Sequence, residues 1–114
     1  MKQRMSRVNE LIHHEISEIL QRDIQGSRFG MVTVTEVRVS KDLRYAKIFF
    51  SVLGESAQKE EAIRMLKGRT ALIQKELGSR IRLRYTPSLQ FVFDETAEKS
   101  ARMFNLFRQL HLDT

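Results

Sequence analysis

Residues that could bind phosphate gather in one segment of this 114-residue chain. Between residues 64 and 84 the only acidic residue is Glu76, against seven basic ones: Arg64, Lys67, Arg69, Lys75, Arg80, Arg82 and Arg84. The other 13 basic and 13 acidic residues cancel, so the net charge of +6 comes from this segment. Such a concentration of positive charge is typical of a protein that binds a polyanion, most often a nucleic acid. The alternative is a solvated basic face that only aids solubility.

The spacing of the first four of these residues predicts a basic stripe on a helix. Arg64, Lys67 and Lys75 recur, together with the small residue Ala71, at intervals of three or four residues, on a different helix face from the apolar stripe. A guanidinium can donate two parallel hydrogen bonds to one phosphate, whereas an ammonium acts as a point charge. We therefore expect this stripe to contact a nucleic-acid backbone.

The last three arginines alternate with apolar residues, which predicts an extended segment after Gly78 with one basic face and one buried face. The basic face would carry Arg80, Arg82 and Arg84, and the buried face Ile81, Leu83 and Tyr85. Together with the helical stripe, this face would border one groove and clamp a nucleic-acid backbone without regard to its sequence. Pro87 marks the point where this segment passes into a strand that belongs to the core.

Three further basic residues lie at the start of the chain: Lys2, Arg4 and Arg7. They either extend the nucleic-acid contact or form a solvated end, and the sequence favours neither interpretation.

The composition argues against catalysis. The chain has no cysteine and three histidines, and it contains neither of the glycine-rich phosphate loops. Glu10, His14 and Glu18 align on one helix face, so a metal-dependent hydrolase is an alternative, although a solvated face is the commoner meaning of such a pattern. We expect no enzyme activity, no cofactor and no small-molecule substrate.

The lack of cysteine also suits a reducing compartment, and no apolar run approaches the roughly 18 residues of a membrane span. We therefore expect a cytoplasmic protein that does not contact a membrane.

The elements that must position the basic residues can be predicted from hydrophobic periodicity. Residues 6–24 predict an amphipathic helix, and residues 31–52 two antiparallel strands, the first with a bulge near Thr35 and Glu36 and the second covered on both faces. A helix follows from Ser56 to Gly78, broken between Gly68 and Ala71, and then a strand over residues 87–94. Residues 96–114 predict a last helix, whose mobility the sequence leaves open. The result is one α+β domain, residues 1–114.

The phenylalanines are expected in the core and not on a platform for unpaired bases: Phe49, Phe50, Phe91, Phe93, Phe104 and Phe107. Structured RNA, recognised through its phosphates and shape, fits this pattern better than readout of single bases.

Two stretches resemble the bacterial ribosome-binding factor A family: residues 32–54, VTVTEVRVSKDLRYAKIFFSVLG, and residues 82–95, RLRYTPSLQFVFDE. The second contains an R-x-x-P-x-L-x-F-x-x-D pattern at Arg84, Pro87, Leu89, Phe91 and Asp94. The resemblance implies a KH-like domain of the type II order, α-β-β-α(kinked)-β-α, with a three-stranded sheet packed against its helices. It also implies a monomeric, non-catalytic factor that binds the small (30S) ribosomal subunit through 16S rRNA and assists its late maturation.

The chain departs from the family at the helix kink. The family has A-x-G there, whereas this chain has Arg69, Thr70 and Ala71 after Gly68. The kink then lies at Gly68 or at Ala71, and Arg69 could offer a side-chain contact to phosphate. A different class of function, an adaptor whose basic face binds an acidic protein, stays open at this point.

Overall fold

The computed structural model describes residues 2–24, 28–83 and 85–96, with side chains from residue 6 onward. Its elements follow in the order α1 (Lys2–Asp23), β1 (Met31–Val39), β2 (Tyr45–Leu53), α2 (Ser56–Gly68), α3 (Thr70–Arg80) and β3 (Ser88–Phe93). This is the predicted α+β order as far as β3. The last helix that we predict lies outside the described residues.

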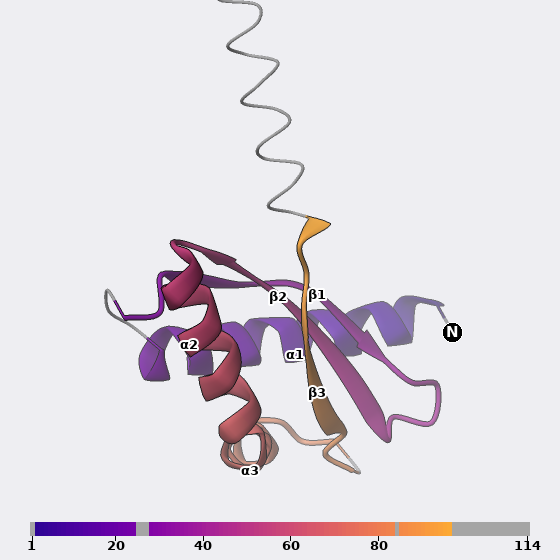
Figure 1. Ribbon diagram of the computed structural model, residues 1–114. Helices are drawn as coiled ribbons and strands as arrows, with labels where there is room; N and C mark the ends of the chain where they lie inside the picture. The colour runs from indigo at the N-terminus through magenta and orange to yellow at the C-terminus, as the bar shows by residue number, and fades with distance from the viewer. Residues whose placement is uncertain (1, 25–27, 84, 97–114) are drawn as a thin grey trace, which may run out of the picture.

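A three-stranded sheet forms the centre of the fold, in the order β1-β2-β3 (Figure 1). The β1 and β2 strands are antiparallel, and the register shifts between Val34 and Glu36. This bulge lets Val34 and Val37 both face the core although they are three residues apart, which confirms the predicted irregularity. The β3 strand pairs with β2 in parallel, so the two helices between them form the crossover connection.

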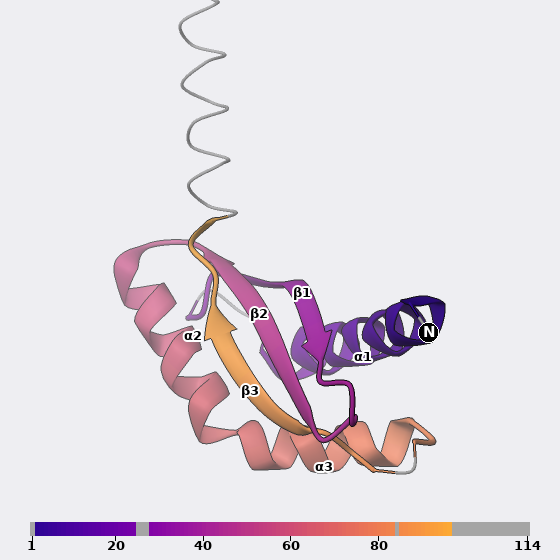
Figure 2. The same ribbon diagram turned by 90° about the vertical axis from the view of Figure 1, so that its right-hand side faces the viewer.

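The described helices cover one face of the sheet (Figure 2). In β2, Ala46, Ile48, Phe50 and Val52 are buried, whereas the alternate residues are exposed or half-buried. The prediction that β2 is covered on both faces is therefore wrong for the described part of the chain, and Phe49 lies half-buried on the open face instead of in the core.

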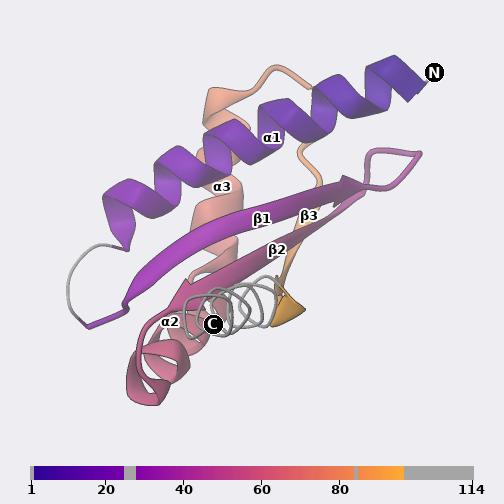
Figure 3. The same cartoon turned by 90° about the horizontal axis from the view of Figure 1, so that it is seen from above.

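The core lies between this sheet and the apolar faces of the helices. Figure 3 shows α1 running along the β1–β2 hairpin, while α3 crosses the direction of α1. The largest fully buried side chains come from α1, β2, α2 and α3: Ile12, Ile16, Ile19, Ile48, Phe50, Leu66 and Leu77. Each helix thus buries a stripe of aliphatic residues at helical spacing.

The long helix predicted from Ser56 to Gly78 is divided at Arg69, which has φ −107° and ψ 8°. The Thr70 hydroxyl donates a hydrogen bond to the Leu66 carbonyl (2.8 Å), which satisfies a carbonyl left at the end of α2. A Cβ added to Gly68 would meet nothing within 4 Å, so the break does not depend on glycine at that position.

Gly30 is required by the turn that leads into β1. Its φ of +66° lies in the left-handed region, and a Cβ on this residue would lie 2.6 Å from the Leu53 carbonyl oxygen. The close approach brings the start of β1 against the end of β2, where Met31 pairs with Leu53.

We predict opposite effects of alanine at two glycines. Gly30→Ala should lower the free energy of unfolding by about 1–3 kcal/mol, because it adds backbone strain and a clash with a carbonyl. Gly68→Ala should raise it by up to about 1 kcal/mol, because a helical residue with free space gains propensity. Urea unfolding of both variants measures the two changes. A Gly30→Ala protein as stable as the parent would show that the turn is not constrained in this way.

Candidate nucleic-acid interface

Three predicted basic residues face solvent at the junction of α2 and α3. Lys67 lies in the last turn of α2, Arg69 is the break itself, and Lys75 lies in the second turn of α3. All three are exposed, and none has an ion pair within the described residues. The first turn of α3 contains no acidic residue, so the positive end of its helix dipole adds to their charge. We call Lys67, Arg69 and Lys75 the basic corner.

The break divides the predicted helical stripe between two grooves. Arg64 and Arg69 border a groove on the α2 side, lined by Arg28, Phe29, Glu61, Arg64, Met65 and Arg69. Glu61 forms ion pairs with Arg64 and, at 3.6 Å, with Arg28. The prediction of one continuous stripe from Arg64 to Lys75 is therefore wrong, because α3 turns away from α2 at Arg69 (Figure 2).

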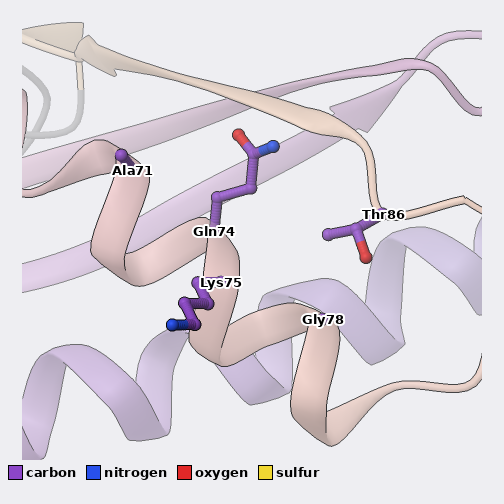
Figure 4. Close-up of a pocket in the computed structure, with 5 residues that line it drawn as sticks. All are labelled: Ala71, Gln74, Lys75, Gly78 and Thr86. Carbon is purple, nitrogen blue, oxygen red and sulfur yellow. The ribbon is translucent and has the colours of Figure 1, made fainter.

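A second groove, the α3 groove, lies between α3 and the loop that enters β3. Figure 4 shows the residues that line it: Ala71, Gln74, Lys75, Gly78 and Thr86. The Gln74 side-chain oxygen accepts a hydrogen bond from the Leu89 amide (3.1 Å), which ties the edge of β3 to α3. A Cβ on Gly78 would lie 2.8 Å from the Thr86 hydroxyl, so glycine lets the loop approach the helix closely. No local pattern in the sequence indicates Gln74 or Thr86, since their role depends on this contact.

Arg80 does not lie on an extended basic face. It is the last residue of α3, because the Ile81 amide still bonds to the Leu77 carbonyl. Eleven residues of helical rise place it about 16 Å along the helix axis from Arg69, so the prediction that Arg80 borders one groove with the basic residues at the helix break is also wrong.

The Arg80 guanidinium donates to carboxylates of α1 and α3 instead. It bonds to Glu18 at 3.1 Å and to Glu15 and Glu76 at 3.4 Å each, and its side chain is 24% exposed. Three carboxylates offset its charge, which makes it a link between the two helices and a poor partner for phosphate.

The remaining residues of the predicted extended segment divide between core and solvent. Arg82 is exposed and Ile81 is buried, as predicted, while Leu83 is half-buried against the core. Tyr85 is 57% exposed, so its assignment to the core is wrong. Thr86 packs on α3 and the next residue, Pro87, is buried, which leaves the Tyr85 side chain largely exposed. Arg84 lies outside the described residues.

The N-terminal basic residues are not brought to the basic corner. Figures 1 and 2 place the start of α1 on the opposite side of the molecule from α2. Arg7 is exposed there, and the side chains of Lys2 and Arg4 lie outside the described part of the chain.

Two acidic residues of α1, Glu15 and Glu18, belong to the contact with α3. The structure groups His14, Glu15 and Glu18, with ligand atoms within 4.8 Å of one another, and not the predicted set with Glu10. Arg80 already donates to Glu15 and Glu18, and a metal ion at these carboxylates would meet its positive charge.

A second arginine completes this contact from α1. Arg22 bonds to Asp23 at 2.9 Å and also to Glu76 on α3. The hydrogen bond from Arg22 lowers the pKa of Glu76 below its ordinary value of 4.5, since it stabilises the charged carboxylate. We call Glu15, Glu18, Arg22, Glu76 and Arg80 the α1–α3 ion cluster.

Among the helices that the structure describes, none combines the length and the apolar character of a membrane span.

Comparisons with known proteins point to one family. Residues 4–107 match the family model described as Ribosome-binding factor A. A curated relative of that name from Halothermothrix orenii is 38% identical over 109 residues, which cover 96% of this chain and 89% of the relative.

Two solved structures are also similar to this chain. The crystal structure of ribosome-binding factor A from Thermus thermophilus is 25% identical with a TM-score of 0.67, over 77% of this chain and 93% of that one. A homology model of the Thermus thermophilus factor, fitted into the cryo-EM map of a 30S–RbfA complex, is also 25% identical and has a TM-score of 0.61. That match covers 74% of this chain and 88% of the fitted one.

We predict that the α1–α3 ion cluster makes stability depend on pH through Glu76. The pKa of Glu76 is lowered in the folded state, so its contribution is full above pH 4.5 and is lost as the pH falls through the folded pKa. Glu76→Gln should therefore melt at a lower temperature than the parent at pH 6, and the difference should shrink toward pH 3.

Glu60→Gln is the matched control, since Glu60 is exposed on α2 and has no ion pair among the described residues. The melting temperature of Glu60→Gln should equal that of the parent at each pH. A difference between Glu76→Gln and the parent that stays constant from pH 6 to pH 3 would refute the linkage.

Proposed function

The chain belongs to the ribosome-binding factor A family, and we propose on this premise that it binds the small (30S) ribosomal subunit through 16S rRNA and assists its late maturation. The fitted Thermus thermophilus model, which belongs to a 30S–RbfA complex, supports the choice of partner. The α-β-β-α-α-β order and the broken helix pair support a KH-like domain of the type II order, a fold class that clamps a nucleic-acid backbone at the junction of two helices.

The observation that carries the proposal is the basic corner. Lys67, Arg69 and Lys75 project from the junction of α2 and α3 without carboxylate partners in the described residues. Arg82, exposed on the loop after α3, adds a further cation beyond the end of that helix. Phosphates are bound best where cations are not already neutralised, and here the acidic residues next to the segment are engaged on the α1 side. Arg80 is for this reason not among the residues that we propose to contact phosphate.

We propose further that the protein acts in the cytoplasm as a monomer, without a cofactor or a catalytic step. The α3 groove offers the Lys75 ammonium, the Gln74 amide and the Thr86 hydroxyl, which can bind phosphates, and none of its lining residues is a carboxylate, a histidine or a cysteine that could serve as a general base or activated nucleophile. The role is thus to bind one state of the rRNA and release it. The other candidate, an adaptor for an acidic protein partner, finds no support in the relatives named above, which carry the name of the ribosome-binding factor.

We predict that neutralising the basic corner weakens binding to isolated small subunits. Each lost phosphate contact should reduce the slope of log affinity against log salt by about 0.7–0.9. The variant Lys67→Gln, Arg69→Gln, Lys75→Gln should lose most of its co-sedimentation at physiological salt and show a slope lower by about 2.

A second triple variant controls for net charge. Arg7→Gln, Arg38→Gln and Lys59→Gln remove the same three charges from surfaces away from the basic corner, and the melting temperature of this variant verifies that it is folded. It should retain the salt slope of the parent. If the two triple variants bound equally well with equal slopes, the basic corner would not be the rRNA contact.

A further inference from the structure

The only two tyrosines of the chain are both exposed and line one groove. Tyr45 is 64% and Tyr85 57% exposed, although large aromatic residues usually bury most of their surface. The groove lies where β2 and β3 begin, and its lining residues are Arg44, Tyr45, Tyr85, Thr86 and Ser88. We call it the tyrosine groove.

Tyr45 is held on a hydrogen-bonded backbone. It is the first residue of β2, and since Ala46 is buried its side chain lies on the open face of the sheet. Its amide donates to the Ser40 hydroxyl at 3.0 Å, and it pairs in register with Ser88, the first residue of β3. The Ser88 amide in turn donates to the Arg44 carbonyl at 2.8 Å. Such a backbone places the ring in position before any partner binds.

Tyr85 is fixed by the residues that follow it. Thr86 packs against the glycine of α3 and Pro87 is buried, so the loop cannot swing its tyrosine freely. The two tyrosines therefore come from separate parts of the chain and present two rings at one open groove.

The charge around the rings is positive. Arg44 is exposed and has no ion pair within the described residues, and Lys41 and Lys47, also exposed, flank it along the chain. The nearest acidic residue, Asp42, accepts hydrogen bonds from the Ser40 hydroxyl (2.6 Å) and the Arg44 amide (3.1 Å). These hydrogen bonds and the nearby Arg44 lower the pKa of Asp42, so its carboxylate stays charged and offsets part of the charge of Arg44. Three cations against one carboxylate still leave the surface net positive, and exposed aromatic rings on a positive surface are the usual platform for unpaired nucleotides.

The tyrosine groove and the α3 groove share one lining residue, Thr86. The α3 groove also contains Lys75, and the tyrosine groove contains both tyrosines. A nucleic-acid strand whose phosphate is bound at Lys75 could therefore reach the rings by way of Thr86.

We propose that Tyr45 and Tyr85 stack on unpaired nucleotides of the bound RNA, while Arg44 contacts an adjacent phosphate. This inference rests on the proposed function and adds to it the class of RNA: a single-stranded segment next to the backbone contact. It revises the sequence-based expectation that stacking plays no part, which considered the phenylalanines and placed Tyr85 in the core. Stacking is tolerant of base identity, so the groove selects unpaired RNA and not a sequence.

The chain has no tryptophan and no other tyrosine, so its tyrosine emission reports on these two rings alone. Titration with a single-stranded RNA of about 10 nucleotides should quench this emission in a saturable way. A duplex of the same sequence should quench it much less, because its bases are already stacked on each other.

The decisive comparison is between two double variants binding to isolated small subunits. Tyr45→Phe, Tyr85→Phe keeps the rings and should bind like the parent, whereas Tyr45→Leu, Tyr85→Leu should bind about 5- to 100-fold more weakly. Both changes are at exposed positions, and melting temperatures establish that both proteins fold.

Equal affinity of the leucine and phenylalanine variants would overturn the stacking proposal. A loss in the leucine variant without quenching by single-stranded RNA would also overturn it, in favour of a contact with a ribosomal protein. Either result leaves the proposed function in place, provided the parent protein co-sediments with the small subunit and the basic-corner variant does not.

Discussion

Two helices joined by a single residue must bury their apolar sides against the same face of one sheet, and the basic surface follows from this constraint. The α2 helix buries Ala62 and Leu66, and α3 buries Ile73 and Leu77. With only Arg69 between them, the helices cannot both continue straight and both reach the core, so the chain turns at that residue. The turn carries Lys67, Arg69 and the first turn of α3 outward together. A cationic corner with a free helix N-terminus is thus a consequence of core packing.

The same packing separates the charges of the basic segment into two groups. Arg80 lies at the far end of α3, where α1 offers Glu15 and Glu18, and it serves to join the two helices. The carboxylates next to α3 take part in that contact, so the opposite side of the helix has no acidic residue. Lys75 lines the α3 groove, which shares Thr86 with the tyrosine groove, and none of the residues that line these two grooves is acidic. Phosphate contacts there supply affinity without regard to sequence, and stacking would restrict binding to unpaired RNA.

Much of the fold could be predicted because it depends on local pattern. The apolar spacing of α1, the β1–β2 hairpin, the bulge before Glu36 and the break between Gly68 and Ala71 are all encoded within a few residues. The predictions were wrong where contacts between residues distant in the sequence determine the structure. Gly78 predicted the end of a helix, but α3 continues to Arg80, whose partners on α1 lie more than 60 residues earlier in the chain. Tyr85 alternates like a core residue, yet Thr86 and Pro87 take the contacts with α3 and the core. Arg28 and Arg69 line the same groove although they are far apart in the sequence, and no local pattern predicts that they meet.

The orientation of the protein on the small subunit tests the central claim most directly. Because the chain has no cysteine, a hydroxyl-radical source can be tethered to a single introduced one. Ala71→Cys places it at the rim of the α3 groove, and Ser6→Cys places it at the exposed start of α1, on the side of the molecule opposite α2 (Figure 1). We expect strong cleavage of 16S rRNA from residue 71 and weak or no cleavage from residue 6. Cleavage from residue 6 that equals or exceeds cleavage from residue 71 would mean that another face of the protein meets the RNA.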